Sequence, residues 1–123
     1  MVGDDNRWTC YLPAMKKFLL ADLEKRVAER ARASAEDSYT RALLDAGVEK
    51  CAKKLGEEAL ETSLAAVGQS KKRVIAEAAD LLYHLLIVLK ARGVKLAAVE
   101  AELGRRTVQS GHAEKASRRK RKG

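Results

Sequence analysis

One stretch of the sequence, residues 74–89, is apolar around most of a helical circumference. Its ionisable side chains other than Tyr83 are Glu77, Asp80 and His84, and these three share one side of a helix with 3.6 residues per turn. A helix this apolar has to be buried against other elements. Its longest apolar run, residues 81–89, has about half the length that a bilayer span needs. The stretch therefore predicts the centre of a helical bundle and no membrane segment.

The rest of the chain favours helix as well. It has 123 residues, a length typical of a single domain, and Pro13 is its one proline, so we expect an all-α fold without strands. Gly56 costs helix stability, which close packing of a neighbour or a ligand would explain. Short connections favour an antiparallel bundle of about four or five helices. The helical segments are predicted at residues 13–33, just before Gly47, and at 48–67, 71–91 and 95–106.

The net charge of +8 is concentrated at one end of the chain. Residues 1–104 carry 17 basic and 16 acidic side chains, whereas residues 105–123 carry 8 basic and 1 acidic. A charge run at a chain end is typical of a solvated tail, so no specific nucleic-acid partner is expected, although weak contact through phosphates stays open. We therefore predict a loose segment at 1–12, a domain at 13–107 and a basic tail at 108–123.

The two cysteines, Cys10 and Cys51, are too few for a disulfide framework, and no CxxC spacing or histidine cluster indicates zinc. Cys51 is expected to be a small core residue. The start of the sequence lacks the basic-then-apolar pattern of a secretory signal. A cytoplasmic location is the resulting expectation.

Acidic residues gather on two consecutive predicted helices. Positions three or four apart share a helix face, so Glu58 and Glu61 lie together, with Glu57 beside Glu61. Glu77 and Asp80 form a second pair, on the segment that should be buried. A buried carboxylate is costly unless it is paired with a cation or bound to a metal. These residues are therefore the strongest candidates for a functional site.

Two inward-facing helices that each carry such a pair can surround a divalent cation with oxygen ligands. Mg²⁺ suits the site, because it prefers an octahedral oxygen shell and commonly bridges carboxylates to substrate phosphates. Salt bridges with Lys54, Arg73 or a partner subunit explain the same carboxylates equally well. A di-iron bundle needs two Glu-x-x-His motifs, and Asp80 stands at the histidine position after Glu77. The spacing alone leaves the metal and the salt bridges open.

Basic side chains and one histidine lie close to the acidic residues. His84 follows Asp80 by one turn, where it could hydrogen-bond that carboxylate or approach a substrate, although a lone histidine in a leucine-rich helix is more often a satisfied core group. The flanking cations could contact phosphates or be surface charges. They are Lys50, Lys53, Lys54 and Arg73.

Several stretches of the sequence resemble one family. They are Ser-Tyr-Thr at 38–40, EKCAKKLGEEA at 49–59, EAADLLYHLL at 77–86, and the three short runs 105–107, 109–111 and 115–117. They are similar to the phosphoribosyl-ATP pyrophosphohydrolases, and the likeness covers about residues 15–118. The wider relatives are the MazG-like all-α nucleotide pyrophosphohydrolases. Their E-x-x-E, spacer, E-x-x-D pattern is matched by Glu58, Glu61, Glu77 and Asp80.

The resemblance implies Mg²⁺-dependent hydrolysis of phosphoribosyl-ATP to phosphoribosyl-AMP and pyrophosphate, the second step of histidine biosynthesis. The four matched carboxylates would hold the metal, and Glu57 or one of these ligands would orient or deprotonate the attacking water. A homodimer that completes the bundle, with the site near its interface, is also implied. Two rivals remain: a related enzyme acting on another nucleoside triphosphate, and a non-catalytic helical dimer that binds nucleic acid through its basic tail.

Overall fold

The computed structural model describes residues 17–108 and 118–120, and within these two ranges the chain forms helices and turns without a strand. The main helices are α2 Leu20–Ala31, α3 Tyr39–Ala46, α4 Val48–Gly68, α5 Lys71–Ala91 and α6 Leu96–Thr107. The prediction of an all-α fold is confirmed. None of the described helices is both long enough and apolar enough to cross a membrane.

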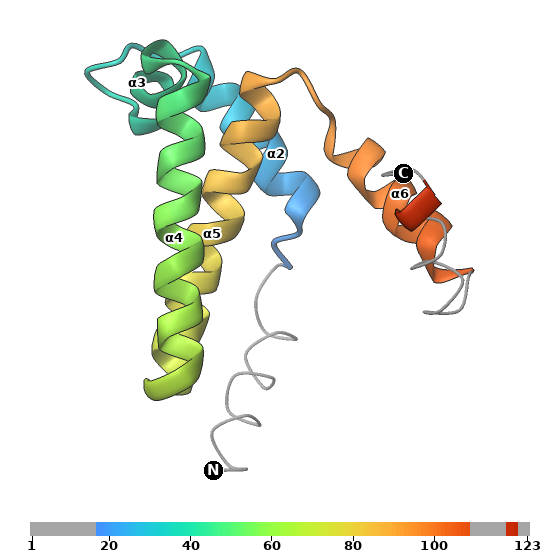
Figure 1. Cartoon of the computed structure of the whole chain (residues 1–123). Coiled ribbons are helices and arrows are strands. Elements are labelled where there is room, and N and C mark those ends of the chain that lie inside the picture. Colours follow the sequence, from blue (N-terminus) through green and yellow to red (C-terminus); the bar gives the residue numbers. More distant parts are fainter. Residues whose placement is uncertain (1–16, 109–117, 121–123) are drawn as a thin grey trace.

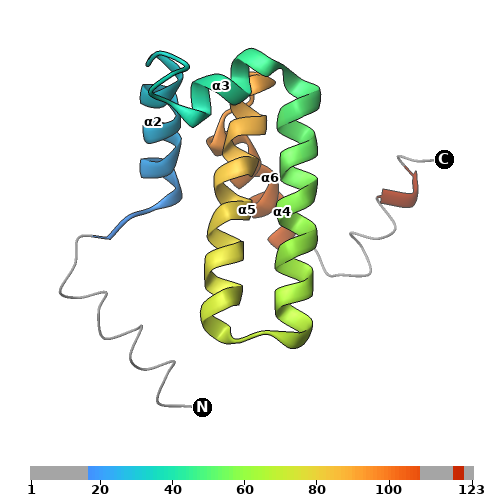
Figure 2. The same cartoon turned by 90° about the vertical axis from the view of Figure 1, so that its left-hand side faces the viewer.

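The helices α4 and α5 form an antiparallel hairpin (Figures 1 and 2). Gln69 and Ser70 make the turn between them, and the Ser70 hydroxyl accepts a hydrogen bond from the backbone N–H of Arg73 at 3.2 Å. This contact caps the first turn of α5, whose amide groups have no partner within the helix. The hairpin therefore places the two acid-bearing segments side by side.

The core lies at the end of the hairpin opposite this turn, where α2 and α3 pack against α5 (Figures 1 and 2). Side chains from five helices meet there and exclude water. The buried members are Val27, Leu43, Cys51, Leu86, Ile87 and Leu96. Burial of Cys51 confirms its prediction as a core residue.

The first of the described helices, α2, begins later than its sequence pattern predicts. It starts at Leu20, and residues 17–19 are not helical, whereas the pattern predicted a helix from Pro13. The backbone of Leu19 is extended, and its N–H donates to Asp22 Oδ2 at 2.8 Å. The Asp22 side chain thus binds the backbone N–H just before α2 and fixes the residue at which this helix starts. Residues 13–16 lie outside the described part of the chain.

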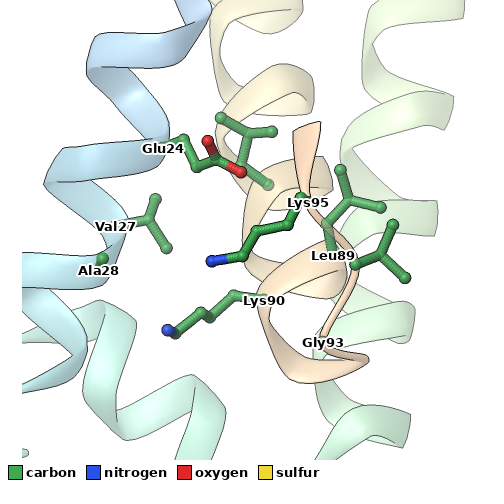
Figure 3. A pocket seen from close by; sticks show the side chains of 9 residues that line it. Glu24, Val27, Ala28, Leu89, Lys90, Gly93 and Lys95 are labelled. Carbon is green, nitrogen blue, oxygen red and sulfur yellow. The ribbon is translucent and has the colours of Figure 1, made fainter. Parts of the chain in front are cut away.

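The helix α6 stands away from α4 and is joined to the body at its first turn (Figure 1). Glu24 Oε2 on α2 accepts a hydrogen bond from the Leu96 N–H at 2.8 Å, so a carboxylate from a distant helix caps α6. Glu24 also lines a small pocket between α2, α5 and the start of α6, along which Lys90 and Lys95 extend (Figure 3). The positive end of the α6 dipole is thus already matched by a negative charge.

The predicted domain limits stay predictions. The segment 1–12 lies outside the described residues, and so does most of the predicted tail at 108–123. The absence of a specific nucleic-acid partner, which was inferred from that tail, is likewise untested.

Ser38 joins three parts of the chain and gives a stability prediction. Its buried hydroxyl donates to the Arg30 carbonyl at 2.8 Å and accepts from the Arg41 N–H at 3.1 Å, which caps α3. We expect Ser38→Ala to lower the free energy of unfolding by about 1–2 kcal/mol, the usual cost of losing an N-cap. Urea denaturation at a fixed protein concentration measures the change. The control is Ser34→Ala, which removes an exposed contact to Asp37 and should be nearly neutral.

Candidate metal centre

Three carboxylates from the hairpin come together at one point. Glu58 on α4 and Glu77 and Asp80 on α5 each place an oxygen within 4.8 Å of the others. Glu77 is 5% exposed, Glu58 is half-buried and Asp80 is exposed. The cluster therefore has a buried floor and one open side through which a substrate could approach.

The rotation of α4 explains why Glu58 faces α5. Cys51 and Ala65 are almost completely buried, and each is seven residues, about two turns, from Glu58. All three side chains therefore share the face that packs on α5. Thr62 lies on this face as well and contacts the backbone of Glu77.

Two oxygen atoms in the cluster are buried without any hydrogen-bond partner among the described residues. They are Oε2 of Glu58 and Oε2 of Glu77. An unpartnered carboxylate oxygen in the interior is costly, and native proteins rarely keep one without a role. Two such atoms beside Asp80 form an all-oxygen donor set of the kind that a hard divalent cation prefers.

The charge state of Glu77 reflects this crowding. Burial raises the pKa of the Glu77 carboxyl, and hydrogen bonding to Glu61 and the charge of Asp80 raise it further. Arg73 opposes the rise, since its Nη2 lies 2.5 Å from Oε1 of Glu77. A bound cation would act in the same direction as Arg73 and favour the ionised carboxylate.

The salt bridges that the sequence left open are present only in part. The pair Arg73–Glu77 forms within α5, and Lys54 Nζ lies 3.1 Å from Glu57 Oε1 within α4. Neither contact involves the buried Oε2 atoms of Glu58 and Glu77. Among the described residues, Glu58 forms no ion pair. The salt bridges therefore leave a role for a cation.

Glu57 and Glu61 lie outside the three-carboxylate cluster. Glu61 is exposed, and it lies near enough to Glu77 to raise the pKa of that carboxyl. Glu57 is exposed too, and its hydrogen bond with Lys54 lowers the pKa of its carboxyl. Glu57 is therefore ionised at neutral pH, able to accept a proton although as a weak base.

The flanking cations divide into two groups. Lys54 and Arg73 each lie one turn before a cluster residue, and because α4 and α5 are antiparallel they flank the cluster on opposite sides along the hairpin. Lys50 and Lys53 are exposed and lower the pKa of Glu57 through their charge. A polyanionic substrate would thus meet positive charge at both ends of the acidic cluster.

His84 is 6% exposed and has protein partners at both ring nitrogens. Its Nδ1 donates to the Asp80 carbonyl at 2.8 Å, so in the neutral ring Nε2 accepts from the Tyr39 hydroxyl at 3.0 Å. Thr40 Oγ1 and the Tyr83 hydroxyl form a second bond between α3 and α5. These contacts fit a satisfied core histidine, and a substrate contact by His84 stays a prediction.

Tyr39 is a candidate site residue for which the sequence predicted no role. Its half-exposed ring meets His84 edge-on, and burial raises the pKa of its hydroxyl while Lys54 opposes the rise. The charges of Glu58 and Glu57 also raise this pKa, so Tyr39 lies within the electrostatic influence of the acidic cluster. The one signal in the sequence was its position in the Ser-Tyr-Thr run.

Comparison with known proteins shows which family the chain resembles. The model of the family described as "Phosphoribosyl-ATP pyrophosphohydrolase" matches residues 20–107. A phosphoribosyl-ATP pyrophosphatase of Azorhizobium caulinodans is 66% identical over 104 residues, which cover 85% of this chain and 95% of the relative. Phosphoribosyl-ATP pyrophosphatase 1 of Bradyrhizobium diazoefficiens is 58% identical over 105 residues, 85% of this chain and 99% of the relative. A phosphoribosyl-ATP pyrophosphatase of Sinorhizobium medicae is 56% identical over 104 residues, which cover 85% of this chain and 97% of the relative.

Proposed function

Because the chain belongs to the phosphoribosyl-ATP pyrophosphohydrolase family, we propose that Glu58, Glu77 and Asp80 hold the Mg²⁺ used in its reaction. The reaction is hydrolysis of phosphoribosyl-ATP to phosphoribosyl-AMP and pyrophosphate in histidine biosynthesis. The observation that carries the metal proposal is the pair of buried, unpartnered oxygens on Glu58 and Glu77. Membership of this biosynthetic family also supports the cytoplasmic location predicted from the sequence.

The carboxylates have distinct parts in this proposal. Glu58 and Glu77 supply ligands from the buried floor, Asp80 supplies one at the open side, and Glu61 reaches the metal as a fourth ligand or steadies Glu77. When bound, Mg²⁺ would neutralise triphosphate charge and stabilise the charge that develops on departing pyrophosphate. The chain's own contribution is to fix the ligand oxygens before substrate arrives, which lowers the cost of organising them.

The flanking residues complete the reaction. Lys54 and Arg73, at the two ends of the cluster, bind phosphate oxygens, with Lys50 and Lys53 adding positive charge nearby. Water attacks one of the two phosphorus atoms joined by the α–β anhydride bond, and that bond breaks. After attack on the α phosphorus, pyrophosphate leaves with the bridging oxygen. After attack on the β phosphorus, pyrophosphate receives the oxygen of the water. Glu57, or one of the metal ligands, orients that water and accepts its proton.

An exposed apolar face supports the proposal of a homodimer. On α4 the side that faces away from α5 carries Gly56, Leu60, Leu64 and Val67, with exposures of 60%, 57% and 89% for the last three. Nothing in the described chain lies within 4 Å of a side-chain carbon built on Gly56. The neighbour expected at this glycine is therefore not among the described residues, and a second copy can supply it. A small chain also gains core by association.

The substrate and metal assignments share one test. Pyrophosphate release from phosphoribosyl-ATP, ATP and dUTP is measured with Mg²⁺ and after its removal with EDTA. We expect kcat/KM for phosphoribosyl-ATP to exceed that for the other two by at least about tenfold, since loss of a few binding contacts costs more than 1.4 kcal/mol. EDTA should reduce turnover by about 100-fold. Equal turnover of all three nucleotides would exclude the substrate assignment, and undiminished turnover in EDTA would exclude the metal.

A further inference from the structure

One hydroxyl lies between the two helices at the level of the acidic cluster. Thr62 Oγ1 on α4 is 2.8 Å from the backbone carbonyl oxygen of Glu58 and 3.0 Å from that of Glu77 on α5. Both carbonyls belong to residues that the proposed function makes metal ligands. With its single proton, the hydroxyl can donate to either carbonyl or be shared between them.

We propose that Thr62 is a positioning residue that sets the separation of the two halves of the metal site. This inference rests on the proposed function, since it concerns how Glu58 and Glu77 are held for the cation. Mg²⁺ demands oxygen ligands at about 2.0–2.1 Å in near-octahedral geometry. A ligand displaced by a few tenths of an ångström binds less well, so a contact that fixes one ligand's backbone relative to the other supports metal affinity.

The packing around Thr62 favours this role. Ala65, one turn further along the same face of α4, is fully buried, so the two helices approach closely at this level. The carbonyl groups of Glu58 and Glu77 already accept the hydrogen bonds of their own helices. Removing the Thr62 hydroxyl therefore leaves no carbonyl without a partner, and its effect is confined to the contact between the helices.

The next residue provides a matched control. Ser63 Oγ donates at 2.9 Å to the carbonyl of Ala59, within α4, and it is exposed. Ser63 therefore makes the same type of hydrogen bond to its own helix as Thr62 but makes no recorded contact with α5. A difference between substitutions at the two positions reports the contact across the hairpin.

The experiment compares Thr62→Val, Thr62→Ser and Ser63→Ala with the full-length protein. Mn²⁺ binding to the substrate-free protein is measured by electron paramagnetic resonance, with Mg²⁺-dependent pyrophosphate release measured in parallel. We expect Thr62→Val to weaken Mn²⁺ binding about tenfold, at the lower end of what loss of an outer-sphere contact costs. The Mg²⁺ concentration for half-maximal activity should rise by a similar factor, with kcat at saturating Mg²⁺ nearly unchanged. Thr62→Ser and Ser63→Ala should both bind Mn²⁺ like the parent protein.

Two results would overturn the inference. One is Mn²⁺ binding by Thr62→Val that equals that of the parent protein. The other is equal weakening by Thr62→Ser, because the methyl group and not the hydroxyl would then be responsible. Failure of the proposed function is recognised separately, since in that case the parent protein itself would bind no Mn²⁺ and release no pyrophosphate in a metal-dependent way.

Discussion

Replacing Glu77 with glutamine should lower kcat/KM for phosphoribosyl-ATP by about a thousandfold, because it removes a ligand charge from the floor of the metal site. The substitution keeps the size of the side chain. It also removes a buried charge that lies against Glu61 and Asp80. We therefore expect the metal-free variant to be at least as stable as the parent protein, so that activity falls while the fold persists.

Thermal unfolding with and without Mg²⁺ separates the two effects. A ligand that binds the folded state alone stabilises it, so Mg²⁺ should raise the midpoint of the parent protein and leave that of Glu77→Gln unchanged. The matched control is Glu100→Gln, at an exposed position on α6, which should alter neither activity nor the Mg²⁺ effect. Full activity of Glu77→Gln would exclude Glu77 as a required ligand.

The limits of α4 and α5 could be predicted because their signals are local. Ser70 caps α5, Gly47 with its positive φ of 103° separates α3 from α4, and the apolar pattern spans each helix. The start of α2 could not be predicted in this way. Pro13 is a residue that favours the start of a helix. The observed start depends instead on the hydrogen bond from the Leu19 N–H to the Asp22 carboxylate.

The acidic cluster could be predicted from the sequence, except for which glutamate of α4 belongs to it. Periodicity puts Glu77 and Asp80 on one side of α5, but three glutamates compete on α4. Which of them faces α5 depends on the rotation of that helix, which its buried positions Cys51 and Ala65 reveal. The result is that Glu58 joins the cluster directly, while Glu61 meets it through Glu77.

The partner of His84 could not be found from spacing. Tyr39 is 45 residues away, and its hydroxyl reaches the imidazole because α3 packs on α5. Helical periodicity describes one helix at a time, so it shows that a polar group is buried and not what satisfies it. The sequence therefore leaves both roles of His84 open. The contacts with Tyr39 and Asp80 fit a satisfied core group, and a substrate contact stays a prediction.

The exposed face of α4 gives the second large effect. In a two-fold dimer built on this face, Leu64→Glu would introduce one negative charge from each subunit into the interface, and neither charge would have a partner there. An uncompensated buried charge costs about 3–5 kcal/mol, so the dissociation constant of the dimer should rise by about a thousandfold. Analytical ultracentrifugation across a dilution series measures the shift from dimer to monomer.

The same position offers its own control, because Leu64→Met keeps an apolar side chain of similar volume and should leave the dimer intact. Leu64 is 57% exposed in the single chain, so neither substitution should disturb the fold of the monomer, and circular dichroism should show unchanged helix content. A Leu64→Glu protein that remains dimeric at the lowest concentrations would show that another face forms the interface. The space that the described residues leave beside Gly56 would then need a different occupant, such as a bound ligand.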